Sequence, residues 1–501
     1  MSVSFYKRLL RRYRPLQTRA VRRDFLRLTL AASGGLLLSC APALPRGGRA
    51  KPEGPRVVVV GAGFAGLACG YELHAAGYAV TIVEARNRVG GRVSTVRDLV
   101  PGKTVEGGGE LIGSNHPTWV AYAQRFGLRF YDVTTSERAA SPVSLDGRLL
   151  TPEEAEALFE ELDSAYQGMT ADAAAIDADE PWRSPDASRL DRRSAADWVG
   201  GLQLSERARL AMAVELLDNG VPLDRQSYLG HLAQVKGGGL ERYWEDSEAY
   251  RCRGGSDRLA QVLAAAIGAE NLRLGTPVTA IQVGDAGVAV ACADGSRLEA
   301  DDAVVTVPPS VWHGIRFTPA LPPALDPQMG VSVKYLAAVR DHFWREDGLG
   351  PDALTNGMIS RTWEGTDDQE GPGAALVAFS AGPPAEQSRQ RWVQAKDQAY
   401  AAELARLYPK YPARFVASRF VDWPGEEWTR AGSSFPAPGE VTTVGPLLRR
   451  GLGRLHFAGE HTCYKFVGYM EGALNSGAAL AKRLAVRDGV AEALGIAAAV
   501  A

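Results

Sequence analysis

The clearest hydrophobic pattern lies near the start of the chain, where apolar runs flank a glycine-rich turn. Residues 57–60 are four consecutive valines, which is typical of a parallel strand buried on both faces. Residues 65–76 are expected to form a helix that ends near Gly77, and the apolar run at 79–83 predicts a second strand that ends at Glu84. This order of elements predicts a β-α-β unit.

The turn in this unit carries Gly61, Gly63 and Gly66 in the spacing G-x-G-x-x-G. The first glycine permits a tight turn, the second lets the backbone approach a pyrophosphate, and the third lets the helix pack closely on the strand. Glu84 follows 23 residues after Gly61, where a carboxylate meets the ribose hydroxyl in dinucleotide-binding units. These signals together predict a dinucleotide site, and the alternative is a β-α-β unit that binds no nucleotide.

Further along, the pattern changes to helices and then back to strands. Residues 151–234 are rich in Ala, Glu, Leu and Arg, with a 3.6-residue period at 153–162 and 206–217, which predicts a helical lobe with a loop at 179–193. Apolar runs predict later strands at residues 276–283, 287–293, 303–307, 331–339 and 455–460. Strands and helices in this mixture favour an α/β fold.

Composition and charge exclude several classes of protein. Of the 501 residues, 46% are hydrophobic, which is an ordinary share for a globular fold. The net charge is −2, and the chain after residue 39 carries 47 Lys and Arg against 57 Asp and Glu, which argues against nucleic acid as a partner. Four cysteines follow Cys40 without disulfide-framework or metal spacing, and the seven histidines are scattered, so no metal site is expected.

The first 43 residues resemble an export signal. Arg22 and Arg23 open a twin-arginine-like motif, and the apolar run at 28–38 is too short for a permanent membrane span. Cys40 resembles the lipidated cysteine of a lipoprotein, and the alternatives are cleavage after Ala43 or an uncut basic tail. We therefore expect contact with the twin-arginine export machinery and a periplasmic or membrane-anchored, extracytoplasmic location, with a possible membrane tether at Cys40.

Three separated segments resemble the flavin-dependent monoamine oxidases. Residues 84–92, which read EARNRVGGR, resemble the extension that follows the dinucleotide motif in FAD-binding amine oxidases. Residues 250–259 resemble the family's second glycine pair before a helix, and residues 455–474 resemble its third flavin element. The resemblance covers about residues 55–485 and implies FAD as the cofactor.

The resemblance implies a flavin contact for each segment. The glycine turn and Arg92 are expected at the phosphates, Glu84 at the ribose and the backbone of Val278 at the adenine. Glu460 is expected at the ribityl chain, and the helix that starts near Met470 is expected at the isoalloxazine, because a helix start offers free N–H groups to an anionic ring. The cofactor-binding residues expected on this basis are Gly61, Gly63, Phe64, Ala65, Gly66, Glu84, Ala85, Arg86, Gly91, Arg92, Gly109, Glu110, Val278, Gly459, Glu460, Tyr469 and Met470.

Two side chains are expected to take part in catalysis. Lys334 matches the family's active-site lysine, which holds a water at flavin N5 and is implicated in the reaction of reduced flavin with oxygen. The alternative is a strand lysine that faces solvent. Tyr469 aligns with one of two tyrosines that face each other across the substrate amine, and the alternative is a tyrosine that packs under the flavin without a chemical role.

The sequence departs from the family at positions that bear on the substrate. Ser434 stands where the second tyrosine is expected, unless Phe435 fills that place from the adjacent register. Leu111 stands where relatives that oxidise L-amino acids have an arginine for the carboxylate, unless an arginine in the helical lobe takes that part. Glu110 is expected either to attract an ammonium group or to bond backbone amides nearby. The candidate substrate-lining residues are Glu110, Ser434 and Trp428. Leu111 and Glu110 favour an amine or polyamine-like substrate over an α-amino acid, and Ser434 in place of the second tyrosine argues against simple arylalkylamines.

We expect an α/β fold in which a Rossmann-like FAD-binding domain is interleaved with a substrate domain made of a mixed sheet and helices. The FAD-binding domain is expected at residues 54–129, 249–323 and 425–487, and the substrate domain at 130–248, which is largely helical, and 324–424. Residues 1–43 are assigned to the export signal and the start of a tether.

The resemblance implies an enzyme that oxidises small-molecule amines with O2. Hydride passes from the carbon next to nitrogen to flavin N5, oxygen reoxidises the flavin to give hydrogen peroxide, and the imine hydrolyses to a carbonyl compound and ammonia. The alternatives are an L-amino acid oxidase, a flavin dehydrogenase or desaturase with another acceptor, and an exported flavin-binding lipoprotein without turnover.

Ser433 stands where some relatives carry the cysteine that bonds to the flavin, so we predict that FAD is held without a covalent bond. Denaturing the purified protein with acid or heat is expected to release yellow flavin into the supernatant. Colour retained in the protein pellet would contradict this prediction.

Overall fold

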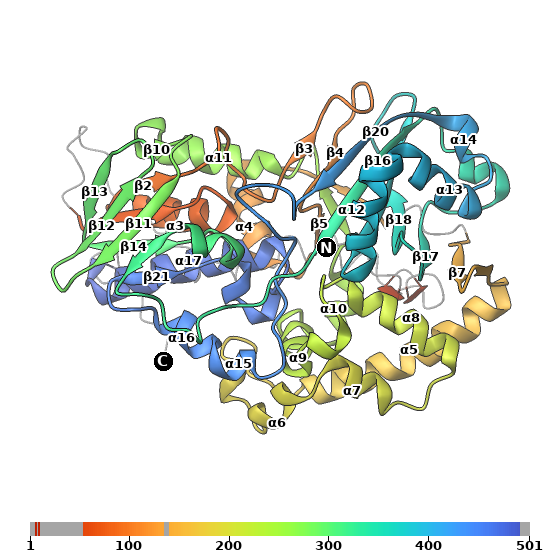
Figure 1. The fold of residues 1–501 in the computed structure, drawn as a ribbon, viewed down its shortest axis with the longest axis horizontal. Coiled ribbons are helices and arrows are strands. Elements are labelled where there is room, and N and C mark those ends of the chain that lie inside the picture. The colour runs from red at the N-terminus through yellow and green to blue at the C-terminus, as the bar shows by residue number, and fades with distance from the viewer. Residues whose placement is uncertain (1–5, 8, 11–53, 135–139, 491–501) are drawn as a thin grey trace.

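The computed structural model describes residues 6, 7, 9, 10, 54–134 and 140–490. The twin-arginine motif at Arg22 and Arg23, the lipidation site at Cys40 and the cleavage site at Ala43 lie outside the described residues. Figure 1 shows the glycine-turn part of the chain on the left, a second large sheet at the upper right and a helical lobe below that sheet.

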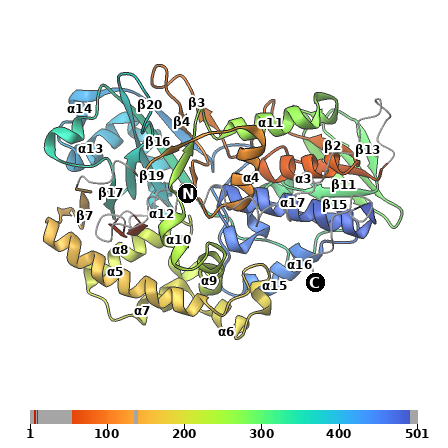
Figure 2. The same cartoon turned by 180° about the vertical axis from the view of Figure 1, so that it is seen from behind.

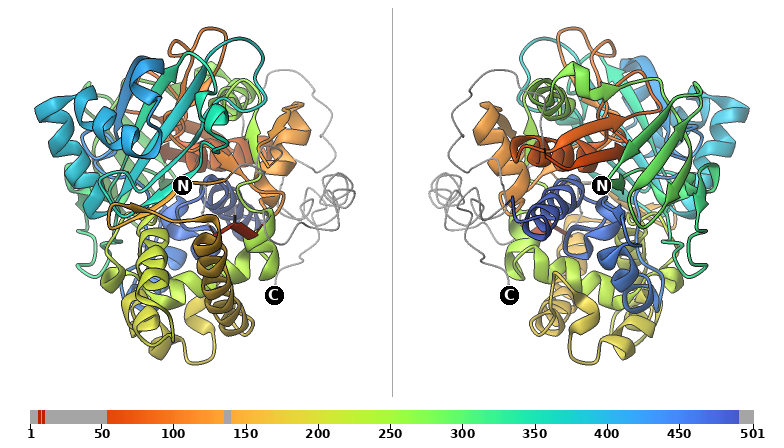
Figure 3. Two further views of the ribbon diagram at one scale, coloured as in Figure 1. Left: turned by 90° about the vertical axis from the view of Figure 1, so that its right-hand side faces the viewer. Right: turned by 90° about the vertical axis from the view of Figure 1, so that its left-hand side faces the viewer.

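A five-stranded parallel sheet forms the centre of the glycine-turn part. Helices α3 (Phe64–Ala75) and α17 (Met470–Arg487) pack together on one face, and Figure 3 shows them side by side in red-orange and blue. A Cβ added at Gly477 would lie 2.2 Å from the carbonyl oxygen of Ala65, so this helix pair needs a glycine there. The sheet order is β10 (Leu272–Arg273), β2 (Ala79–Val83), β1 (Arg56–Val60), β14 (Asp302–Val305) and β21 (Leu455–Phe457).

The valine run of β1 is buried on both faces, as predicted. Val57 and Val59 pack with α3 and α17, whereas Val58 and Val60 pack with a four-stranded sheet on the opposite face. That sheet has the order β13 (Arg297–Ala300), β12 (Val288–Cys292), β11 (Val278–Val283) and β15 (Arg316–Thr318). The central sheet is therefore covered on both sides, as parallel sheets generally are.

A mixed seven-stranded sheet forms the core of the other half, with β17 and β7 parallel and the remaining neighbours antiparallel. Figure 2 shows it from behind, above the helical lobe. Its order is β20 (Phe415–Asp422), β16 (Ser332–Val339), β19 (Ala374–Ala381), β18 (Arg361–Glu364), β17 (Ala353–Thr355), β7 (Val143–Leu145) and β8 (Arg148–Leu149). The structure thus confirms the predicted α/β class with a Rossmann-like parallel sheet and a mixed substrate sheet.

The helical lobe contains α5 (Pro152–Ala173), α6 (Ala187–Arg192), α7 (Ala195–Gly200), α8 (Glu206–Leu217), α9 (Tyr228–Gly237) and α10 (Glu241–Asp246). The predicted helix at 206–217 is confirmed, but the loop expected at 179–193 was wrong because it contains α6. Buried Asp191 accepts hydrogen bonds from Ser227 and Thr442, which lie far away in sequence. These tertiary contacts hold a helical turn that no local pattern indicates.

The remaining elements connect these layers. A three-stranded sheet has the order β5 (Leu111–Ile112), β9 (Tyr250–Cys252) and β6 (Phe130–Asp132), and β3 (Thr95–Val96) pairs with β4 (Val105–Glu106). The other helices are α4 (Pro117–Phe126), α11 (Asp257–Ile267), α12 (Pro383–Ala395), α13 (Asp397–Leu407), α14 (Tyr411–Arg414), α15 (Glu440–Thr443) and α16 (Gly445–Arg450). Within the described ranges, no helix has the length and apolar character needed to cross a bilayer.

A buried ionic cluster around Glu110 joins the small sheet to the seven-stranded sheet. The Glu110 carboxylate accepts hydrogen bonds from Arg251 Nη2 of β9 at 2.8 Å, from Lys334 Nζ of β16 at 2.7 Å and from Trp363 Nε1 of β18 at 2.9 Å. The Glu110 side chain has no exposed surface. Burial alone would raise the pKa of the Glu110 carboxyl, but Lys334 and Arg251 outweigh burial and lower the pKa to about 2.

Glu106 lies four residues earlier and behaves in the opposite way. Burial raises the pKa of the Glu106 carboxyl to about 7, although it accepts hydrogen bonds from the Ser256 amide at 2.7 Å and the Thr95 hydroxyl at 2.9 Å. Two buried glutamates in one segment thus have pKa values shifted in opposite directions, so one can serve as the control for the other.

We predict that Glu110→Gln lowers the free energy of unfolding at pH 8 by about 3–5 kcal/mol, because Lys334 and Arg251 lose the carboxylate between them. Glu110 has a depressed pKa in the folded state, so its contribution is present above about pH 4.5 and is lost as the pH falls toward about 2. Chemical denaturation followed by circular dichroism measures this difference.

Glu106→Gln is the matched control. The pKa of Glu106 is raised in the folded protein, so its contribution to the free energy of unfolding is present below about pH 4.5 and is lost as the pH rises to about 7. Glutamine does not ionise, so the variant lacks this loss. The variant is therefore expected to match or exceed wild-type stability at pH 8. Equal losses in the two variants would contradict the assignment of Glu110 as the charged centre of the cluster.

Candidate functional site

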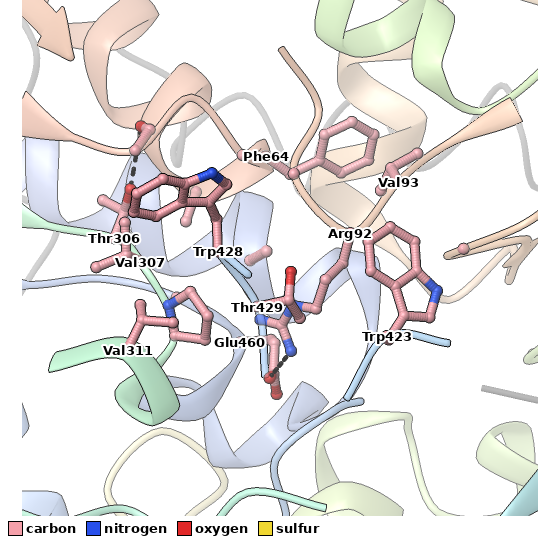
Figure 4. Close-up of a pocket in the computed structure, with 18 of the residues that line it drawn as sticks. Phe64, Arg92, Val93, Thr306, Val307, Val311, Trp423, Trp428, Thr429 and Glu460 are labelled. Carbon is pink, nitrogen blue, oxygen red and sulfur yellow. Dashed lines mark hydrogen bonds and ion pairs between the residues drawn. The ribbon is translucent and has the colours of Figure 1, made fainter. Parts of the chain in front are cut away.

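A long pocket lies at the carboxyl ends of the parallel strands β1, β2 and β14, where ligands of open α/β sheets bind. Figure 4 shows part of its lining, including Arg92 and Glu460. Two of the three segments that resemble flavin contacts, residues 84–92 and 455–474, contribute to its lining, whereas no residue of the segment 250–259 lines it. The predicted cofactor residues that line it are Gly61, Gly63, Phe64, Ala65, Glu84, Ala85, Arg86, Gly91, Arg92, Gly109, Val278, Gly459, Glu460, Tyr469 and Met470.

The glycine turn presents an open helix start to this pocket. Gly61 has a φ of +108°, and a Cβ at Gly66 would lie 2.0 Å from the carbonyl oxygen of Gly61, so both positions require glycine. Gly66 therefore acts through helix packing and does not itself line the pocket. The N-cap of α3 is Gly63, which provides no side-chain cap. The first N–H groups of this helix are therefore available for an anion such as a phosphate.

Glu84 lies at the end of β2 and is held in a defined orientation. Its carboxylate accepts hydrogen bonds from the Ala62 amide at 2.8 Å and the Arg86 amide at 2.9 Å, and only 4% of the residue is exposed. The Arg86 guanidinium in turn pairs with Glu426. The geometry leaves the carboxylate on the pocket wall, where a ribose hydroxyl can donate to it.

Glu460 also lines the pocket and links the C-terminal part of the chain to Arg92. Its carboxylate accepts hydrogen bonds from Arg92 Nη1 at 2.8 Å, from the Ser434 hydroxyl at 2.6 Å and from the Gly468 amide at 2.7 Å. Burial raises the pKa of Glu460, but Arg92 and His461 together with the hydrogen bond from Ser434 outweigh burial, so the net shift is downward. Glu460 therefore holds the loop before α17 in place, and α17 begins at the pocket with an N-cap, Tyr469, that provides no side-chain cap.

Lys334 lies on β16 and reaches the pocket with only 4% of the residue exposed. Its Nζ donates to the carbonyl oxygens of Glu106 at 3.2 Å and Gly108 at 2.9 Å, and to Glu110 at 2.7 Å. The solvent-facing alternative therefore does not describe this lysine. Because its donors have protein acceptors, a water or oxygen species at Nζ needs one of these bonds to open.

Tyr469 is buried where the pocket meets the helical lobe. Its hydroxyl lies 3.0 Å from Glu248 Oε1 and 3.2 Å from the Tyr243 hydroxyl, and its ring meets the Tyr243 ring at 82° with centroids 6.5 Å apart. Burial, together with Tyr243 and Glu248, raises the pKa of Tyr469 well above its usual range, so the phenol stays protonated. Tyr243 and Glu248 did not emerge from the sequence, because neither belongs to a recognisable motif.

The residues considered for the place of the second tyrosine lie elsewhere. Ser434 turns onto Glu460, and Phe435 is fully buried with its ring 4.5 Å from that of His231. Glu110 is enclosed in its ionic cluster and is not among the residues that line the pocket. Its contacts are structural, but its carboxylate bonds side chains, including those of Arg251 and Lys334, and not the backbone amides that were expected. Trp428 does line the pocket, and Figure 4 shows it on the opposite side from Trp423.

The pocket has the groups that an FAD molecule needs. Two helix starts without side-chain caps open into it, and a buried carboxylate lies at the end of the second strand, where a ribose is expected. Within the described parts of the chain, no group of three or more His, Cys, Asp and Glu side chains could hold a metal ion. The residues present therefore fit a flavin dinucleotide.

Comparison with known proteins agrees with this geometry. The chain is 26% identical to an L-amino acid dehydrogenase of Synechocystis, covering 85% of this chain and 94% of that protein. It is 28% identical to the flavin-containing amine oxidase B of Sus scrofa, with 85% of each chain covered. A solved structure of putrescine oxidase bound to putrescine superposes with a TM-score of 0.77 at 25% identity, covering 86% of this chain and 99% of that one.

The family model for flavin-containing amine oxidoreductases matches residues 64–485, which include Gly66, Lys334 and Tyr469. This match spans most of the described chain and both halves of the fold. The protein belongs to the flavin-containing amine oxidoreductase family.

Proposed function

We propose that this chain is an FAD-dependent oxidase of amines that passes electrons to oxygen. The observation that supports this most directly is that Lys334 and Tyr469 line the same pocket as the open starts of α3 and α17. The start of α3 corresponds to the nucleotide side of one site, the start of α17 and Lys334 to the side of the flavin ring, and Tyr469 to the substrate side. When bound, FAD supplies the acceptor for a hydride equivalent from the carbon next to the amine nitrogen.

The chain's own side chains bind and orient the reactants. The α3 start would hold the phosphates of FAD, Glu84 would accept a hydrogen bond from its ribose, and the N–H groups at the start of α17 would stabilise negative charge on its ring. Tyr469, kept as a neutral phenol, guides the amine toward the ring. Lys334 supplies a buried positive charge where oxygen gains electrons, and such fixed charges stabilise developing anions strongly.

The pocket supports an amine better than an α-amino acid. Leu111, at the position where amino-acid oxidising relatives have an arginine, is buried in an apolar cluster. Its cross-strand neighbour Arg251 is already bonded to Glu110 and to the carbonyl oxygen of Glu364. A substrate carboxylate therefore gains no guanidinium from this strand pair. The putrescine bound to the related putrescine oxidase points in the same direction.

A second candidate is an L-amino acid dehydrogenase that uses an acceptor other than oxygen. The similarity to the Synechocystis L-amino acid dehydrogenase supports it.

We also retain the proposal of twin-arginine export, which rests on the motif at residues 22–27 and the apolar run at 28–38.

We predict that the purified holoenzyme produces hydrogen peroxide with amines and not with L-amino acids. A peroxidase-coupled assay over monoamines, diamines and L-amino acids measures this, and an anaerobic arm with a dye acceptor detects dehydrogenase activity. Peroxide formed only with amino acids would favour an amino acid oxidase. Dye reduction without peroxide would favour the dehydrogenase.

We predict that Lys334→Met slows the oxidation of the reduced enzyme by O2 roughly 100-fold, because the positive charge near the developing anion is lost. Stopped-flow spectroscopy separates this step from reduction by the amine. Lys410→Met is the control, since Lys410 is a surface lysine paired with Glu346. An unchanged reoxidation rate in Lys334→Met would remove this lysine from the oxygen reaction.

A further inference from the structure

A smaller cavity lies between the helical lobe and Tyr469. Its walls come from α5, α8, α9 and α10, and it shares Asp218 and Tyr469 with the cofactor pocket. Glu215 and Glu248 also line it, so its lining is acidic. The buried guanidinium of Arg361 lies 2.7 Å from both Glu215 and Asp218 and pairs with these two carboxylates.

A lysine from the N-terminal segment enters this cavity. Figures 1 and 2 show the red segment that contains Lys7 beside α8, far in sequence from the rest of the site. Lys7 is only 1% exposed. Its Nζ lies 3.0 Å from Glu248 Oε1, 3.3 Å from the Tyr469 hydroxyl and 4.3 Å from the centre of the Tyr243 ring. A carboxylate, a phenol oxygen and an aromatic face together recognise a primary alkylammonium group.

Glu248 is held for this contact by an unusual backbone. Its φ is +62°, in the left-handed region that residues with a Cβ rarely occupy, and only 3% of the residue is exposed. The same carboxylate oxygen that meets Lys7 also accepts a hydrogen bond from Tyr469 at 3.0 Å. Strained backbone that presents a buried acid beside an active site is a feature from which a functional role is inferred.

The charge of Glu248 determines which nitrogen it can bind. A buried carboxylate favours the protonated form of an amine that pairs with it. Oxidation requires the lone pair of the reacting nitrogen, so a nitrogen held at Glu248 is not the one that reacts. Because Tyr469 borders both cavities, a molecule with two amino groups can place one beside Glu248 and the other in the pocket that contains Lys334.

We propose that Glu248, Tyr243 and Tyr469 form a subsite for the non-reacting ammonium of a diamine or polyamine, and that Lys7 competes for this subsite from within the same chain. The role of the second nitrogen rests on the proposed amine oxidation. Binding of the ammonium itself needs no turnover, so the two can be tested separately.

The test measures binding of 1,4-diaminobutane and n-butylamine by calorimetry, using full-length holoenzyme whose flavin has been reduced under nitrogen so that no substrate is consumed. Lys7→Met removes the internal ammonium, and Lys7→Arg is the matched control that keeps a cation. We expect Lys7→Met to bind 1,4-diaminobutane at least about tenfold more tightly than wild type and Lys7→Arg to resemble wild type. Equal affinity in wild type and Lys7→Met would overturn the competition.

Adding Glu248→Gln to Lys7→Met tests the subsite. We expect this change to weaken the binding of 1,4-diaminobutane at least about tenfold and to affect the binding of n-butylamine much less, because only the diamine places a second ammonium at residue 248. If the affinity for both amines falls to the same degree, the assignment to a non-reacting nitrogen is overturned. If the affinity for neither amine falls, the subsite itself is overturned. Binding that depends on Glu248 without amine oxidation would contradict only the proposed function.

A second measurement uses the wild-type chain and needs no substitution. Since Lys7 is buried when it pairs with Glu248, 1,4-diaminobutane is expected to accelerate tryptic cleavage after Lys7, detected by mass spectrometry as loss of the first seven residues. The neutral analogue n-butanol is expected to have no effect. An identical cleavage rate with and without the diamine would contradict displacement of Lys7.

Discussion

Glu460 receives hydrogen bonds from Arg92, Ser434 and Gly468, and this contact joins the C-terminal part of the chain to Arg92, which lies 368 residues away in sequence. A carboxylate taken out of water is costly unless donors surround it, so these segments must meet for the chain to fold. Glu84 and Glu110 obey the same constraint, one at the nucleotide end and one behind Lys334. The walls of the pocket are therefore held by buried acids, and folding itself assembles the site.

The ionic cluster around Glu110 also links the joint between two sheets to the pocket. Glu110 pairs with both Arg251 and Lys334 inside that joint, and Lys334 extends from it to the pocket. The lysine is thus oriented by the same contacts that hold the sheets together. On the far side of Tyr469 the lining is acidic, which suits cationic substrates more than carboxylates. The two sides of one tyrosine therefore present different electrostatic environments to a single bound molecule.

Much of this could be predicted from the sequence because short-range patterns encode it. The valines of β1, the glycine turn and the start of α17 each have a local physical reason, and the structure places the end of β1, the glycine turn and the start of α17 at one pocket. Tyr243 and Glu248 could not be found in this way. They become neighbours of Tyr469 only through the packing of the helical lobe, and α6 likewise depends on contacts between Asp191 and distant residues. Glu248 lies two residues before β9, and in the sequence alone nothing distinguishes it from other acidic residues.

The proposed subsite depends on whether the N-terminal segment that carries Lys7 is still attached to the chain. The sequence predicts that residues 1–39 are an export signal, and Lys7 belongs to that signal. While this segment is attached, Lys7 of the same chain pairs with the buried Glu248 carboxylate. Twin-arginine transport carries folded proteins, so the predicted export route implies that the precursor folds before transport. On this proposal, removal of the signal also removes Lys7, and the subsite opens to cationic amines only in the exported protein.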